Sequence, residues 1–183
     1  NRSIAAAVAK AGFATGSTDG AQRVITLTAK GGTVVVAVTD TEAHLALGTK
    51  AIKAKDLAKN LTKTVDAITT AKAKAVFAEA NQHYSLGEFD QALASYSLAY
   101  RLQPLPAFLF NIAQCHRKLG HYRDAIAMYQ NYLVGVPDAP HGDVVESLIQ
   151  EARERQAEED QRTAAQAKLA ADLEAKRIEA EKN

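Results

Sequence analysis

Three histidines and the single cysteine are the residues of this sequence best suited to metal chemistry. The cysteine, Cys115, lies close in sequence to His116 and His121, and His83 stands further toward the N-terminus. Imidazole and thiolate are common zinc ligands. However, His83 and His116 occupy equivalent positions of a repeated pattern, so helix packing accounts for both, and no carboxylate or second cysteine completes the usual ligand spacing. We therefore expect no metal site and no cofactor, and we expect Cys115 to be a small buried or half-buried hydrophobic residue.

Two further clusters could suggest catalysis or nucleotide binding. Asp40, Glu42 and His44 follow an apolar stretch that predicts a strand, and Gly31 and Gly32 could belong to a phosphate loop. The glycines lack the Gly-Lys-Ser/Thr ending of a Walker loop and the dinucleotide fingerprint. Polar residues after a strand are most often a connection between strands. We expect no catalytic residue, so the protein is predicted not to be an enzyme.

Composition narrows the classes of function. The chain has 183 residues, of which 47% are apolar and 23% charged, and its formal net charge is +1. This balance gives no overall field to attract nucleic acid. No apolar run reaches the roughly 18 residues of a membrane span. The first residue is Asn1 rather than methionine, so we expect a processed or trimmed chain, with a removed signal peptide as one explanation.

Residues 1–70 are predicted to form a small α/β module. The stretch "SIAAAVAKAGF" predicts a short helix, and "RVITLTAKGGTVVVAVTD" predicts a β-hairpin that turns at its two glycines. The second strand is apolar on both faces, which indicates a central strand, and "AHLALG" is a candidate third strand. From Asp56, apolar residues recur at helical spacing, so a helix is expected to close the module against the sheet.

Residues 71–140 contain a sequence pattern that occurs twice, with a constant offset between matching positions. Each copy divides at a glycine into two expected helices of about a dozen residues, and a proline ends the second. The matching residues are Phe77 and Phe110, Ala80 and Ala113, His83 and His116, Leu86-Gly87 and Leu119-Gly120, Phe89 and Tyr122, Ala92 and Ala125, Ala94 and Ala127, Tyr96 and Tyr129, and Pro104 and Pro137.

This spacing of small and aromatic residues resembles the tetratricopeptide repeat, over two repeats and a capping helix. The resemblance implies an all-α superhelix whose leading helices line a concave groove that binds a peptide or helix of another protein. The overall class is then α+β. By alignment to the family, the protein-binding groove residues are Phe77, Asn81, Tyr84, Ser85, Phe110, Asn111, Gln114, Arg117 and Lys118.

One subtype of the family clamps a C-terminal carboxylate with two asparagines and three basic residues. Asn81 and Asn111 match the asparagines, but Phe77, Pro140 and Val144 stand where bases are needed, so we do not expect this clamp. The second repeat is also similar to repeats of myxobacterial and related deltaproteobacterial envelope proteins. That similarity implies a bacterial periplasmic or membrane-associated location, with the cytoplasm as the alternative.

Residues 141–183 predict a capping helix that extends into a long charged helix. Asp143 and Glu146 have the spacing of a capping box, and an apolar stripe from Val144 to Ala152 precedes a stretch rich in Ala, Glu, Lys and Arg. A solvated or coiled-coil arm fits this pattern, and it could join copies of the chain. The leading hypothesis is thus a protein-binding scaffold. The alternative is a structural assembly subunit whose N-terminal module or C-terminal helix makes the main contacts.

Overall fold

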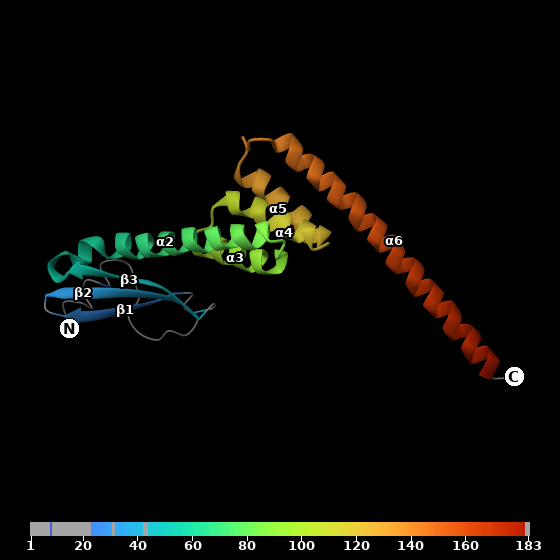
Figure 1. The fold of residues 1–183 in the computed structure, drawn as a ribbon, viewed down its shortest axis with the longest axis horizontal. Coiled ribbons are helices and arrows are strands. Elements are labelled where there is room, and N and C mark those ends of the chain that lie inside the picture. The colour runs from blue at the N-terminus through green and yellow to red at the C-terminus, as the bar shows by residue number, and fades with distance from the viewer. Residues whose placement is uncertain (1–7, 9–22, 31, 42–43, 182–183) are drawn as a thin grey trace. The chain divides into compact units, whose positions relative to one another are not determined.

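The computed structural model describes residue 8 and residues 23–30, 32–41 and 44–181. Within these residues, a three-stranded antiparallel sheet is followed by helices, which confirms the α+β class (Figure 1). The chain divides into two compact units. The first comprises Asn1–Gly87 and Ala94–Pro104, and the second comprises Glu88–Leu93 and Leu105–Asn183.

The sheet of the first unit has the order β1-β2-β3. Its strands are β1 (Arg23–Lys30), β2 (Thr33–Asp40) and β3 (Leu45–Lys53), and β2 pairs antiparallel with both neighbours. Lys30 pairs with Thr33, and Gly32 has φ +77°, a conformation that costs glycine little. The predicted hairpin, the third strand and the central place of β2 are therefore confirmed.

The core of the first unit lies between the sheet and helix α2 (Leu57–Ser85), which a 3-10 turn, η1 (Ala54–Asp56), connects to β3. Side chains of β2 alternate, so that every second residue faces this core and the others are partly exposed. The buried members on β2 are Val34, Val36 and Val38, and those on α2 are Leu57, Leu61, Val65, Ile68 and Ala73.

The boundary expected between residues 70 and 71 lies inside α2. The sequence suggested one helix that closes the sheet module and another that opens the repeat, but α2 runs unbroken for 29 residues. The junction "TTAKAKAVF" contains neither glycine nor proline and is rich in strong helix formers, so nothing stops the helix there. The helix expected in "SIAAAVAKAGF" lies outside the described residues except for Val8, which is helical and packs on the same core.

Helix α3 (Phe89–Leu102) ends against the sheet of the first unit. The Arg23 guanidinium of β1 donates hydrogen bonds to the carbonyl oxygens of Arg101 and Leu102 at 3.1 and 2.9 Å. These carbonyls belong to the last turn of the helix, where no partner exists within the helix itself. An arginine of the first strand therefore caps the helix that ends the first repeat.

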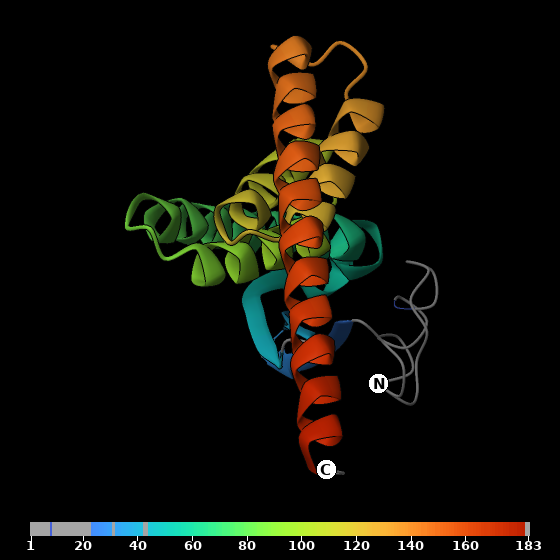
Figure 2. The ribbon, with the colours of Figure 1, turned by 90° about the vertical axis from the view of Figure 1, so that its right-hand side faces the viewer.

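The second unit contains α4 (Pro106–Lys118), α5 (Tyr122–Gly135) and α6 (Gly142–Glu181). Figure 2 shows α6 starting beside α5 and continuing beyond it. The two helices share a core with α4, and the first half of α6 is therefore a packed helix. The buried residues of this core are Ala113, Ala125, Tyr129, Val145 and Ile149.

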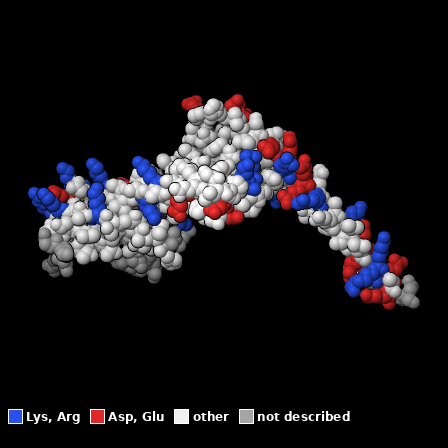
Figure 3. Space-filling view, viewed as in Figure 1, with Lys and Arg blue, Asp and Glu red and all other residues white. Residues whose placement is uncertain are grey.

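Helix α6 begins one residue earlier than its predicted cap. The His141 carbonyl oxygen accepts from the amides of Val144 and Val145, so Asp143 lies in the first turn rather than at the cap. Residues 161–181 are exposed on every side. Lys, Arg, Asp and Glu are interspersed along this helix in Figure 3, and pairs such as Arg177 with Glu174, at 2.7 Å, link successive turns. None of the described helices has an apolar stretch long enough to cross a lipid bilayer.

Candidate functional site

The two predicted helix breaks lie at equivalent glycines. Gly87 separates α2 from α3, and Gly120 separates α4 from α5, each with φ +79°. The Gly87 amide donates to the Tyr84 carbonyl at 3.1 Å, and the Gly120 amide donates to the Arg117 carbonyl at 3.3 Å. Such bonds close a helix end around a left-handed residue, which is usually glycine. The repeat in sequence is thus a repeat of helix-turn-helix geometry.

The same aromatic contact recurs in both hairpins. Within the first unit, the Phe77 and Tyr96 rings have centroids 5.4 Å apart and planes inclined at 58°. Within the second unit, Phe110 and Tyr129 stand at 5.8 Å and 60°. Tilted ring pairs at this distance are favourable beyond the area that they bury. Each leading helix is therefore held to its second helix by the same pair of rings.

Asn81 is fixed by the first hairpin and reaches the surface. The Tyr96 hydroxyl donates to its Oδ1 at 2.7 Å, and the Ser85 hydroxyl donates to its backbone oxygen at 2.8 Å. Asn81 and Ser85 are both exposed. Because the side-chain oxygen is held inside the hairpin, the orientation of the Asn81 amide is set before any ligand binds.

The equivalent position in the second hairpin, Gln114, has a different partner. Arg117 donates to Gln114 Oε1 from Nε and Nη2 at 3.3 and 3.1 Å, and its Nη1 lies 3.6 Å from Glu151 Oε1 on α6. Arg117 and Lys118 are the two basic groove residues that could contact an acidic element of a ligand. Glu151 already offsets the charge of Arg117, so the exposed Lys118 is the better candidate for that contact.

All nine predicted groove residues are at least partly accessible. Asn81, Ser85 and Lys118 are exposed and the others are half-buried. Consecutive groove residues on each helix are one, three or four positions apart in the sequence. Residues at this spacing lie on the same face of a helix. The α2 residues are Phe77, Asn81, Tyr84 and Ser85, and the α4 residues are Phe110, Asn111, Gln114, Arg117 and Lys118.

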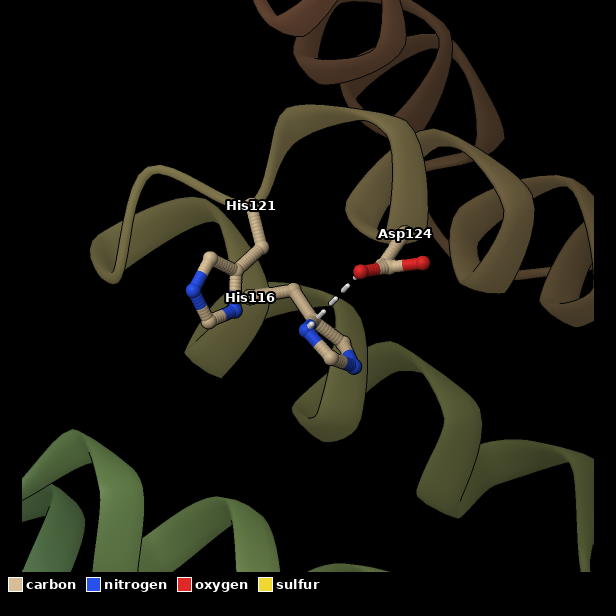
Figure 4. Close-up of side chains that lie close together, drawn as sticks. All are labelled: His116, His121 and Asp124. Atoms are coloured by element: carbon tan, nitrogen blue, oxygen red, sulfur yellow. Dashed lines mark ion pairs between the residues drawn. The ribbon is translucent and has the colours of Figure 1, made fainter.

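A second cluster surrounds the turn between α4 and α5. His116 comes from the last turns of α4, His121 from the turn itself, and Asp124 from the first turn of α5, and Figure 4 shows the His116 ring between the other two side chains. His116 Nδ1 lies 4.0 Å from Asp124 Oδ2, and the histidine rings have centroids 5.7 Å apart. One ligand atom from each residue lies within 4.8 Å of the others.

Backbone hydrogen bonds hold the two histidines of this cluster. The His121 amide donates to the His116 carbonyl oxygen at 2.8 Å, and the neighbouring bond from Gly120 to Arg117 completes a Schellman motif. The His121 carbonyl oxygen accepts in turn from the Ala125 amide at 3.0 Å, which starts α5. The turn chemistry that ends one helix and begins the next therefore fixes the separation of the two histidine backbones.

The electrostatics of the cluster centre on His116. Burial lowers the pKa of His116, the Asp124 carboxylate raises it, and His121 lowers it, with a net decrease. At neutral pH the imidazole is therefore mainly uncharged. Its Nδ1 is buried and has no hydrogen-bond partner. A buried polar atom of this kind is uncommon in folded proteins.

The other residues that could carry chemistry are buried, exposed or paired with a neighbouring charge. Cys115 is buried, as predicted, and burial raises the pKa of its thiol to about 11. His83, on α2, lies 3.9 Å from Glu79. Asp40 is buried with Arg101 Nη2 at 3.9 Å, whereas His44 is exposed and Glu42 lies outside the described residues. The interpretation of Asp40 as part of a connection was wrong, because Asp40 is the last residue of β2 and lies buried beside Arg101.

Sequence inspection missed Asp124 as a neighbour of the histidines. His121 lies just beyond the end of the helix that carries His116, and Asp124 lies just inside the next helix. These positions bring three donors together only because Gly120 reverses the chain between them. Metal-ligating residues that stand on both sides of a glycine predicted to end a helix are the signal that identifies this cluster.

No protein-family model matches this chain, and a comparison with curated proteins finds no match either.

Proposed function

We propose that the protein is a non-enzymatic scaffold of the tetratricopeptide type, which binds a peptide or helix of another protein on the leading helices of its two hairpins. The recurrence of one hairpin carries this proposal. The same glycine turn and the same ring pair occur in both copies of the repeat, with Phe77 and Tyr96 matched by Phe110 and Tyr129. Repeated units of this kind stack and offer an extended surface for partners.

The exposed chemistry defines the partner class. Phe77 and Phe110 are half-buried and offer apolar contact, whereas Asn81 and Asn111 offer amides that can pair with a peptide backbone. Lys118 can bind an acidic side chain. Pro140 and Val144 are exposed but carry no charge. The ligand is therefore a partly apolar internal segment rather than a chain terminus held by its carboxylate.

The test is site-specific photo-crosslinking followed by affinity measurement. A photoreactive phenylalanine analogue at Ser85 or Lys118 is expected to capture a partner from the native lysate, whereas the same group at Gln130, exposed on α5, is not. The captured protein is then purified, and its affinity is measured by calorimetry for wild-type and variant chains.

Variants of accessible groove residues separate binding from folding. Asn111→Ala with Lys118→Ala is expected to weaken binding by about tenfold or more, as interface hot spots do. Gln130→Ala with Asn131→Ala is the matched control on α5. Phe77 and Phe110 are left intact because their rings also hold the hairpins together. Equal affinity of both double variants, or capture from Gln130 alone, would refute the proposal.

The alternative, a structural assembly subunit, rests on the far half of α6. Leu169, Leu173 and Ile178 are 61%, 59% and 41% exposed, so this charged half of α6 carries three large apolar side chains that a second helix could cover. If this helix joins copies of the chain, Leu169→Glu with Leu173→Glu will convert a dimer into a monomer in analytical ultracentrifugation. A wild-type monomer would remove the form of this alternative in which the C-terminal helix joins copies of the chain, and would leave contacts through the N-terminal module.

A further inference from the structure

We propose that His116, His121 and Asp124 form a binding site for a divalent transition-metal ion, for which zinc is the probe. The site is separate from the proposed partner-binding residues and does not depend on that function. Two imidazoles and a carboxylate are donors that zinc, cobalt, nickel and copper accept, whereas magnesium and calcium prefer oxygen ligands alone.

The ligand atoms of the three residues need to move only a short distance toward one another to bind a zinc ion. Zinc bonds to nitrogen and oxygen of about 2.0–2.2 Å place tetrahedral ligand atoms about 3.3 Å apart. The three candidate atoms lie within 4.8 Å of one another, so the widest separation must shrink by at most about 1.5 Å to give zinc bonds of ordinary length. His121 and Asp124 are exposed and can rotate, whereas the half-buried His116 supplies the fixed position.

The backbone keeps two of the three ligands in place before a metal arrives. The Schellman bond from the His121 amide to the His116 carbonyl oxygen spans the turn, and Asp124 follows in the first turn of the next helix. Pre-organised ligands lose less conformational freedom when they bind. A metal ion at this place would link the end of α4 to the start of α5.

The unsatisfied nitrogen of His116 is an independent indication of a ligand. His116 Nδ1 is buried without a hydrogen-bond partner, and Asp124 Oδ2, at 4.0 Å, is too distant to accept a hydrogen bond from it. An ion between the two atoms would give His116 Nδ1 a partner and would be neutralised in part by the Asp124 carboxylate. Three protein ligands leave the fourth tetrahedral position for water or for a donor from a bound molecule.

The first hairpin provides a control within the same chain. His83 is the counterpart of His116, but Glu88 and Gln91 stand where the second hairpin has His121 and Asp124. The donor set is therefore incomplete there. His83→Ala removes an equivalent histidine and leaves the proposed site intact.

The experiment is a titration of the full, tag-free chain with zinc chloride in a calorimeter, repeated with cobalt to record its visible absorption. We expect one zinc ion per chain and a cobalt spectrum of low coordination number. Loss of an outer-shell partner alone weakens metal binding by about 10- to 100-fold, so His121→Ala and Asp124→Asn should each weaken zinc binding by at least that much. His83→Ala should bind as the wild type does.

Because His121 and Asp124 are exposed, their variants are expected to fold, which circular dichroism will verify. Three outcomes would overturn the proposal. The wild-type chain could bind zinc no more tightly than the double variant His121→Ala with Asp124→Asn does. His83→Ala could lose as much zinc affinity as the site variants do, or magnesium could bind as tightly as zinc.

Discussion

Arg101, at the end of α3, lies with its Nη2 3.9 Å from Oδ1 of Asp40, a β2 carboxylate whose side chain is only 3% exposed. Arg23, on β1, donates to the carbonyl oxygens of Arg101 and Leu102. The strand β2 therefore contacts the Arg101 side chain, and β1 contacts the backbone of the same helix end. Both strands hold the end of α3. This arrangement joins the sheet and the C-terminal part of α3 in the first unit.

Asp40→Asn should destabilise the first unit by about 1–3 kcal/mol, because a buried charge partner is lost while Arg101 keeps its charge. The lower part of that range is favoured, since the Arg101 side chain is 35% exposed and water can solvate it. Urea denaturation followed by circular dichroism measures the change. Asp66→Asn, on the exposed face of α2, is the control and should leave the midpoint unchanged; equal midpoints for both variants would contradict the role of the pair.

Gly135 should not tolerate alanine. A Cβ atom at Gly135 would lie 2.6 Å from Cβ and 2.8 Å from Cγ of Pro106. The proline ring is rigid, so the start of α4 must move, and overpacking of this kind costs about 1–3 kcal/mol. Thermal unfolding measures the loss.

Gly142, at the start of α6, provides the matched control. A Cβ atom there meets Leu133 at 3.9 Å, which is an ordinary contact, and alanine favours helix more than glycine does. Gly142→Ala is therefore expected to be neutral or stabilising. A Gly135→Ala variant as stable as Gly142→Ala would show that the end of α5 does not contact Pro106.

Local patterns predicted the sheet and both helix breaks. The two glycines before Thr33 predicted the hairpin, the β-branched run of β2 predicted its central place, and Gly87 and Gly120 marked the helix breaks. Each of these signals lies within a few residues of the feature that it produces. The boundary expected between residues 70 and 71 lies inside α2, because the sequence there contains no residue that ends a helix.

Contacts between distant residues could not be predicted in the same way. The pairing of Asp40 with Arg101 joins the end of a strand to the end of a helix much later in the chain, and nothing in either local sequence signals it. The bridge from Arg117 to Glu151 likewise depends on where α6 packs. The sequence singled out His116 and His121 but not Asp124, because its carboxylate comes close to them only through the turn that joins α4 to α5.

Thr69→Val should stabilise the protein by about 1 kcal/mol, because burying an unpaired hydroxyl costs that order of free energy. Thr69 is 5% exposed on α2, and its hydroxyl has no hydrogen-bond partner. Valine keeps the branched shape without the polar atom. The adjacent Thr70→Val, at a partly exposed position, is the control and should change the unfolding free energy by less than ~0.5 kcal/mol. A loss of stability in Thr69→Val would mean that the hydroxyl has a partner.

Cys115 should report the opening of the second hairpin. Its side chain is fully buried and the pKa of the thiol is raised to about 11 by that burial, so the folded chain presents almost no thiolate to a labelling reagent at mildly alkaline pH. Labelling then requires local unfolding of α4. Gly120→Ala forces a left-handed conformation on alanine at φ +79°, which costs about 1 kcal/mol.

That cost should raise the rate of Cys115 labelling by about fivefold when opening is a rapid pre-equilibrium. The rate is measured with a chromogenic disulfide below the denaturation midpoint. Lys118→Ala, an exposed change at the end of α4, should leave it near the wild-type value. If Cys115 of the wild-type chain reacts as fast as a free thiol, the cysteine is accessible without opening and the packing of α4 on α5 is looser than its burial implies.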